Sequence, residues 1–180
     1  MLISHSIEEI SQLSDEIVLI NKGVSVTAGK LSEIMIKNAY KHFFGKFESG
    51  TILHGRIISK DFIYKITSVN VENTIITLPG IFKNVGEEIR LRVRARDVMI
   101  SKKTFDFKTK ENNFTGVIIE IIIEKETAFA EVLIKIKARK NIQFLRARIT
   151  RLELKKMNIK INQKIFAHIK SVSFDRQAII

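Results

Sequence analysis

Apolar residues in the first 45 positions follow two different spacings. Over 7–13 and again over 31–43 they stand three or four residues apart, which predicts two short amphipathic helices. Between these helices, 15–20 and 24–29 are short apolar or alternating runs that predict two strands. The tripeptide Asn-Lys-Gly at 21–23 is a hairpin signal, so the two strands should pair with each other. A small mixed α/β segment is therefore predicted here.

From about residue 50 onward, apolar and polar residues alternate with a period of two, as in strands with one buried face. The predicted strands lie at 51–59, 62–71, 74–78 and 89–99, and then at 114–124, 129–138, 143–150 and 164–174. A stretch rich in Lys and Asn at 102–113 separates the two series as a linker, and 152–157 is predicted to be a short helix. The two series fit two copies of a five-stranded, OB-like barrel of about 60 residues each.

The chain carries a large positive charge that is concentrated toward its C-terminus. Its 180 residues include 31 Lys and Arg against 19 Asp and Glu, a formal net charge of +12. Residues 101–180 alone hold 18 basic and 8 acidic side chains. Such a field favours anionic partners, namely nucleic acid, anionic lipid or small oxyanions. Surplus lysine that only keeps the protein soluble is the competing interpretation.

Composition and motifs exclude several classes of function. The chain has no cysteine, which excludes disulfides, thiolate metal sites and cysteine nucleophiles. It contains no phosphate-binding P-loop, dinucleotide-binding glycine motif, nucleophile elbow or zinc-protease motif, and its four histidines lack ligand spacing. We therefore expect neither an enzyme that is active by itself nor a metal site. No apolar run approaches the ~20 residues of a membrane span and no signal peptide is visible, so a cytoplasmic location is expected.

Three groups of motifs resemble one protein family. The first comprises 3–10 and 14–23, which are similar to the switch histidine, helix and hairpin at the end of an ABC-type ATPase domain. The second is Val-Arg-Ala-Arg-Asp-Val at 93–98. The third is Ala-Arg-Ile-Thr-Arg at 147–151 followed by Ala-His-Ile-Lys-Ser-Val at 167–172. In this order they resemble the C-terminal part of the ATP-binding subunit of molybdate ABC importers, over nearly the whole chain.

The resemblance implies a fold and a division of the chain. The fold class would be mainly β with a small α/β N-terminal segment, and two OB-like, molybdate-binding-type modules (TOBE or Mop modules) in tandem. The end of an ATPase domain would occupy 1–45, the first module 46–101, the linker 102–113 and the second module 114–180. His5 matches the histidine that contacts the γ-phosphate of ATP in the family. It would act only with an ATPase half that this sequence lacks, and whether a separate chain supplies that half stays open.

The resemblance also implies an oxyanion-binding site in the second module. Thr150, Lys170 and Ser171 match the family's binding residues there, and Arg148 could add positive charge. Thr109 stands where the family uses a serine hydroxyl. A tetrahedral dianion needs several converging donors, which hydroxyls, backbone N–H groups and basic side chains supply. The expected ligand is molybdate or tungstate, with no tightly bound cofactor.

Two positions, Glu111 and Asn162, depart from the family pattern, and a third feature concerns the first module. Glu111 replaces an arginine, and the reversed charge would repel an oxyanion, so whether it abolishes binding stays open. In the first module, Arg96 and Asp97 stand at the places equivalent to Lys170 and Ser171, and the aspartate makes this module structural rather than oxyanion-binding. Asn162 replaces a glycine, and asparagine tolerates a left-handed turn.

The family context also suggests partners. A homodimer is expected, because related modules place their oxyanion sites between subunits. A membrane permease would be contacted through the ATPase half, which would make the protein peripheral on the inner face of the plasma membrane.

Two other classes of function compete with oxyanion binding. A purely structural or self-association module is one, because Arg148 and Lys170 alternate with apolar neighbours as on any strand with a solvent face. In that case Thr150 and Ser171 would only satisfy turn backbone. Nucleic-acid binding is the other, since OB-like barrels with a basic face often bind single strands. Basic and aromatic residues do not interleave on one face here, so nucleic acid is not the expected partner.

Overall fold

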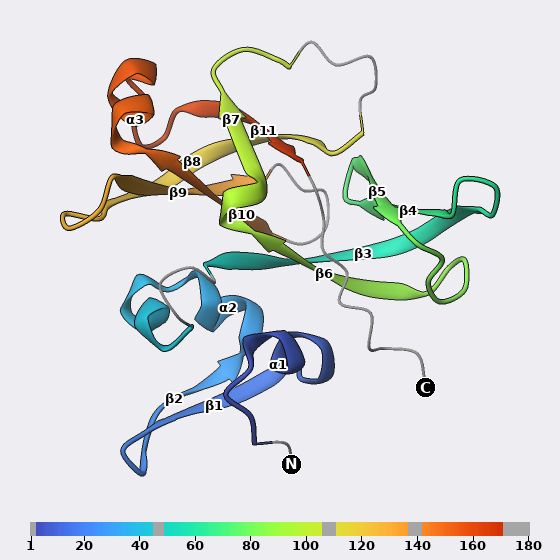
Figure 1. Cartoon of the computed structure of the whole chain (residues 1–180), viewed down its shortest axis with the longest axis horizontal. Helices are drawn as coiled ribbons and strands as arrows, with labels where there is room; N and C mark the ends of the chain where they lie inside the picture. Colours follow the sequence, from blue (N-terminus) through green and yellow to red (C-terminus); the bar gives the residue numbers. More distant parts are fainter. Residues whose placement is uncertain (1–2, 45–48, 106–110, 137–141, 171–180) are drawn as a thin grey trace.

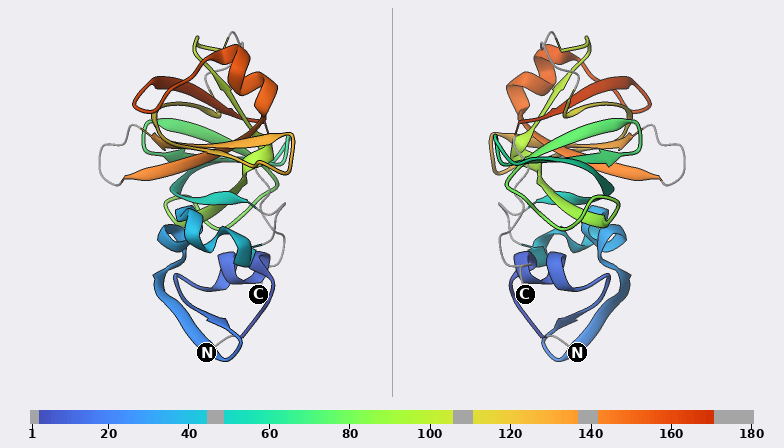
Figure 2. Two further views of the ribbon diagram at one scale, coloured as in Figure 1. Left: turned by 90° about the vertical axis from the view of Figure 1, so that its left-hand side faces the viewer. Right: turned by 90° about the vertical axis from the view of Figure 1, so that its right-hand side faces the viewer.

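A computed structural model describes residues 3–44, 49–105, 111–136 and 142–170 (Figure 1). Within these ranges the chain forms a small α/β segment followed by two antiparallel sheets, of four and five strands. The α/β segment lies at one end of the molecule and the sheets lie at the other (Figure 2). Among the described ranges, no helix has the length and apolar character that crossing a bilayer requires.

The N-terminal segment runs α1 (Ile7–Leu13), β1 (Glu16–Asn21), β2 (Val24–Lys30), α2 (Leu31–Ile36) and the 3₁₀ helix η1 (Asn38–Phe44). The predicted hairpin is confirmed, with β1 and β2 antiparallel. The single helix predicted over 31–43 is wrong. Lys37 is extended at φ −77° and ψ 122°, and the Ile36 carbonyl accepts a hydrogen bond from the Arg146 guanidinium at 2.7 Å. This long-range bond lies at the break between α2 and η1.

The first sheet contains β3 (Gly50–Asp61), β4 (Ile66–Val71), β5 (Thr74–Pro79) and β6 (Glu88–Arg94), in the order β5-β4-β3-β6. The strand predicted to begin at 62 begins four residues later. The Asp61 carboxylate accepts hydrogen bonds from the N–H groups of Ile63 and Tyr64, both at 2.9 Å. These two bonds close a turn where alternation alone predicts strand.

The second sheet contains β8 (Asn113–Ile123), β9 (Phe129–Ile136), β10 (Gln143–Thr150) and β11 (Lys164–Ile169), with α3 (Arg151–Met157) between the last two. Its fifth strand, β7 (Val98–Ser101), comes from the range assigned to the first module and pairs with β11. The single strand predicted over 89–99 is therefore wrong. The 3₁₀ turn η2 (Ala95–Asp97) separates β6 from β7, and β7 joins the other sheet.

Apart from β7, both sheets have the same strand order: β3 lies between β4 and β6, and β8 lies between β9 and β11. Two glycines mark equivalent positions near the start of each unit. A Cβ at Gly55 of β3 would lie 2.5 Å from Val69, and one at Gly116 of β8 would lie 2.5 Å from Ile134. Both positions therefore require glycine because the neighbouring strand packs directly against the backbone. The predicted fold class, mainly β with two OB-like modules in tandem, is confirmed.

The two sheets share one hydrophobic core. Side chains from both pack into a single cluster, with Leu53, Leu91, Ile134 and Ile165 each fully excluded from solvent. Across the junction, the Gln143 amide bonds the backbone of His54 in both directions, accepting at 2.8 Å and donating at 3.0 Å. The assignment of 46–101 and 114–180 as two modules stays a proposal, since β7 and this core bind the two parts together.

Substituting Gly116 by alanine should destabilise the protein by about 1–3 kcal/mol, because the added Cβ meets the Ile134 side chain and the Lys135 carbonyl at 2.5 and 2.6 Å. Urea unfolding followed by circular dichroism measures this. Val117→Ala on the same strand, where the side chain is 39% exposed, is the matched control and should cost less. Equal stability of Gly116→Ala and the parent protein would contradict the packing described here.

Candidate functional site

The structure describes four of the six residues singled out from the sequence. Thr109 and Ser171 lie outside the described residues. His5 is exposed and precedes α1. Arg148 and Thr150 belong to β10, and Lys170 directly follows β11. The second sheet thus holds three of the candidate side chains.

Thr150 ends β10 and caps α3. Its hydroxyl accepts the Glu153 N–H at 3.1 Å, while its own N–H and hydroxyl donate to the Glu153 carboxylate at 2.7 and 2.8 Å. The hydrogen bond from the Thr150 backbone, followed by that from its hydroxyl and by the charges of Lys170 and Lys156, outweighs burial and lowers the pKa of Glu153. The Thr150 donors are therefore already bound to a carboxylate of the chain itself.

Lys170 has an exposed side chain and a fixed backbone. Its N–H donates to the carbonyl of Asp97 at 2.8 Å, next to the pairing of Ile169 with Val98. The sequence comparison of the two modules aligned Lys170 with Arg96, and the structure brings these two equivalent segments side by side. The adjoining His168 has its Nδ1 2.9 Å from the Asn113 amide oxygen, and burial, with the charge of Lys170, lowers its pKa.

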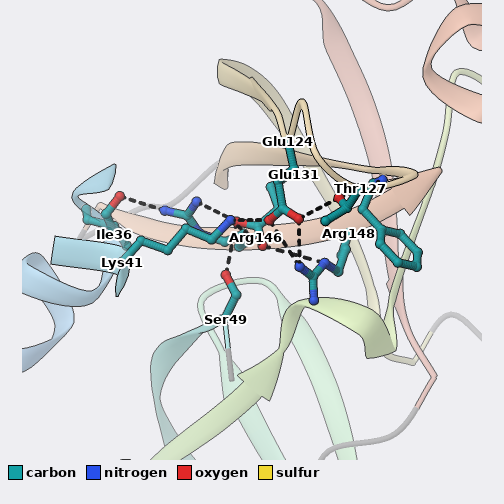
Figure 3. Close-up of polar contacts among 9 residues, drawn as sticks. Ile36, Lys41, Ser49, Glu124, Thr127, Glu131, Arg146 and Arg148 are labelled. Carbon is teal, nitrogen blue, oxygen red and sulfur yellow. Dashed lines mark hydrogen bonds and ion pairs between the residues drawn. The ribbon is translucent and has the colours of Figure 1, made fainter. Parts of the chain in front are cut away.

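Arg148 is held in a network of ion pairs (Figure 3). Its terminal nitrogen donates to both carboxylate oxygens of Glu124, at 3.0 and 3.1 Å. Its Nε lies 3.8 Å from the Glu131 carboxylate, and the guanidinium lies 5.0 Å over the ring of Phe129. The Arg148 side chain is only 9% exposed. The interpretation of Arg148 as a solvent-facing strand residue is therefore wrong.

At the centre of the network is Glu131, whose side chain is completely buried. One of its oxygens accepts from Arg146 and from the Ser49 hydroxyl, each at 3.0 Å. The other lies 3.1 Å from the Lys41 ammonium, and Lys41 also contacts Glu124 directly. Lys41 belongs to η1, so the network joins the N-terminal segment to the second sheet.

Sequence reasoning missed Glu131, Arg146 and Lys41. A usable signal was present, because Glu131 stands among the apolar residues at 129–134 of β9, of which five consecutive residues, 130–134, are buried. Antiparallel pairing then places Glu131 directly opposite Arg148. The period of two suggests that one face of β10 is exposed to solvent, but Arg146 on that face is fully buried, hydrogen-bonded to Glu131 and to the Ile36 carbonyl.

The network has three cations and two carboxylates, and it lies largely out of water. Burial raises the pKa of the Glu124 carboxyl, but hydrogen bonds from Lys41 and Thr127 and the charges of Lys41 and Arg148 outweigh it, so the pKa is lowered. The Nε of Arg146 is buried and has no hydrogen-bond partner within the described ranges. The arrangement fixes η1, the residue before β3 and the second sheet relative to one another.

Outside this network, the Glu111 carboxylate accepts a hydrogen bond from the Thr77 hydroxyl at 2.7 Å. Glu111, which stands where the family pattern has an arginine, is thus hydrogen-bonded to β5, an edge strand of the first sheet. Within the described residues, no group of three or more His, Asp or Glu side chains could hold a metal ion.

Comparisons with known proteins identify the relatives of this chain. No protein-family model matches it. It is 30% identical over 179 residues to the molybdenum import ATP-binding protein ModC of Vibrio vulnificus, covering 98% of this chain and 48% of that protein. It is 29% identical over 177 residues to ModC of Brucella abortus, covering 98% and 47%. This chain is a relative of the C-terminal part of ModC.

The resemblance inferred from the motifs is therefore confirmed, and the chain spans about half the length of the ModC proteins it matches. Among solved structures, it resembles the cytoplasmic molybdate-binding protein ModG in a crystal form with molybdate bound. The TM-score is 0.55 at 14% identity, and the match covers 68% of this chain and 93% of ModG. At that identity the likeness shows the fold alone.

Replacing Glu131 by glutamine in this ModC relative should destabilise it by about 3–5 kcal/mol, since the buried cations lose their central carboxylate. Glu88→Gln is the matched control. It removes a carboxylate from the exposed Arg56–Glu88 pair at 3.4 Å and should cost about 0–1 kcal/mol. Urea unfolding of both variants tests the difference, and similar losses in the two would show that burial adds nothing to the network.

Stability should fall in acid partly because Glu124 becomes protonated. Its folded-state pKa is lowered, so its contribution is present above the unfolded value of 4.5 and is lost as the pH falls through the lower folded value. Urea midpoints measured between about pH 6 and about pH 3 should therefore decline less steeply in Glu124→Gln than in the parent protein. Parallel pH profiles would show that Glu124 is not stabilised as the anion.

Proposed function

We propose that this chain is the regulatory, oxyanion-binding portion of a molybdate or tungstate importer's ATP-binding subunit. Two findings support the proposal. Nearly the whole chain matches ModC proteins, and its fold is like that of ModG, which was crystallised with molybdate. The chain spans about half the length of these ModC proteins, and the role proposed for this portion is regulation of transport.

The hydrogen bonds of Thr150 are the structural observation that supports the proposal. Its backbone N–H and hydroxyl donate to one carboxylate, that of Glu153, at 2.7 and 2.8 Å, and the exposed Lys170 directly follows β11 of the same sheet. A molybdate dianion needs such a set of donors. Arg148 would add charge two residues earlier on the same strand. Thr109 and Ser171 complete the proposed site on the sequence match alone.

Further parts of the proposal concern partners. His5 would act as the nucleotide switch only where an ATPase half is present, in the same or another chain, and that half would contact the permease. A homodimer is proposed, because related modules share oxyanion sites between subunits. These statements extend the similarity to ModC, which covers about half of those proteins.

A structural role is the second candidate, and one specific observation favours it. Arg148 is bound to Glu124, and Thr150 takes part in a capping box with Glu153. Each has a complete structural role without a ligand. In that case the chain would serve assembly, and no oxyanion would bind.

Calorimetric titration with molybdate, tungstate and sulfate, at two salt concentrations, separates the two candidates. We expect molybdate and tungstate to bind, and the titration with sulfate measures whether the site selects among the three dianions. Lys170→Ala should weaken binding at least about tenfold by removing a charge-assisted donor. Lys37→Ala is the matched control, since this lysine is exposed and lies in the N-terminal segment.

No heat with any of the three anions would reject oxyanion binding and leave the structural role. Equal affinity in the Lys170 and Lys37 variants would reject the assignment of Lys170. Binding of a single-stranded oligonucleotide, with a steep loss as salt rises, would instead identify a nucleic-acid-binding module.

A further inference from the structure

Three parts of the chain meet at the two carboxylates of the buried network. The N-terminal segment contributes the ammonium of Lys41, and the start of the first sheet contributes the hydroxyl of Ser49. The second sheet contributes both carboxylates, Glu124 and Glu131, together with Arg148. Figure 3 shows these side chains converging on one place. Any change in the partners of these carboxylates is therefore felt in the N-terminal segment.

Lys41 and Arg148 compete for the same acceptors. Each cation lies within ion-pair distance of Glu124, and each also reaches the same oxygen of Glu131, at 3.1 Å for Lys41 and 3.8 Å for Arg148. Both carboxylates are largely shielded from water, at 18% and 0% exposure. With so little solvent to compensate, a carboxylate that loses one cation must hold the other more tightly.

We propose that Glu124 is a positioning residue that couples the oxyanion site to the N-terminal segment through Lys41. This inference rests on the proposed function, because it takes Arg148 as an oxyanion ligand. When an oxyanion attracts the Arg148 guanidinium, Glu124 loses its bidentate partner. The Lys41 ammonium then becomes the principal counter-charge of Glu124, and the N-terminal segment is held more firmly against the second sheet.

The coupling has a definite sign and is reciprocal. If oxyanion binding strengthens the hold of Lys41, then the presence of Lys41 must favour oxyanion binding by the same factor. Without Lys41, both carboxylates depend on Arg148 and retain it. Without the Glu124 charge, Arg148 is released to the ligand. Removing Lys41 should therefore weaken oxyanion binding, and removing the charge of Glu124 should strengthen it.

The first measurement is molybdate affinity by calorimetry in four variants of the full chain. Lys41→Met should weaken binding about fivefold or more, the lower end of typical coupling between sites. Lys41→Arg keeps the cation and should retain most of the affinity. Glu124→Gln should bind more tightly than the parent protein. Lys37→Met, an exposed lysine on the same segment, should change nothing.

The second measurement is hydrogen–deuterium exchange of the amides in 31–44, with and without molybdate. Molybdate should slow this exchange in the parent protein and in Lys41→Arg, but not in Lys41→Met or Glu124→Gln. A merely structural role for Lys41 would change the exchange equally with and without ligand. If Lys41→Met does not fold, the exchange and affinity of Glu124→Gln still decide the question.

The outcomes separate this inference from the proposed function. Absence of molybdate binding by the parent chain would overturn both. Binding with unchanged exchange in 31–44, or with equal affinity in the Lys41→Met and Lys37→Met variants, would overturn the coupling and leave the oxyanion site standing.

Discussion

The fully buried carboxylate of Glu131 is the constraint on which the arrangement of this molecule depends. A carboxylate removed from water must be matched by cations and hydrogen-bond donors, and leaving it unmatched costs several kcal/mol. Here Arg146 and Ser49 donate hydrogen bonds, and the Lys41 ammonium forms an ion pair. They come from the second sheet, the entry to the first sheet and the N-terminal segment. The charge is satisfied only when all three parts of the chain are in place.

The apolar contacts reinforce the same constraint. Strand β7 leaves the first unit to pair with β11, one hydrophobic cluster extends through both sheets, and Gln143 binds the backbone of β3 from the other side of the junction. A second, smaller cluster fixes the N-terminal segment, with Leu31 and Met35 packed on Ile52 of β3. The tandem modules are thus connected by the crossing of β7 into the second sheet, by a shared hydrophobic core and by the buried ion-pair network.

One side chain links this architecture to the proposed function. The proposed function uses the charge of Arg148 for an oxyanion, whereas in the structure the Arg148 guanidinium is hydrogen-bonded to Glu124. Both partners are anions that accept two hydrogen bonds from a guanidinium, so the two uses exclude each other at any moment. Arg148 would therefore pair either with Glu124 or with the oxyanion. The change from one partner to the other would carry the proposed coupling to Lys41.

The local features of this protein were determined by its sequence. Alternation located most strands, the Asn-Lys-Gly turn located the first hairpin, and Asn162 adopts the left-handed conformation expected of it, at φ 66°. Motifs in a fixed order were enough to identify ModC as a relative. These features depend on residues close in the sequence, or on patterns that survive divergence.

Three features were decided by tertiary structure alone. They are the end of α2, the sheet to which β7 belongs and the burial of polar side chains on β10. The Ile36 carbonyl is bonded by Arg146, 110 residues later, and β7 pairs with a strand more than 60 residues away. The pairing of Arg148 with Glu124 likewise joins two residues 24 positions apart. A period of two indicates that side chains alternate between the two faces of a strand, but it does not indicate which other elements pack against each face.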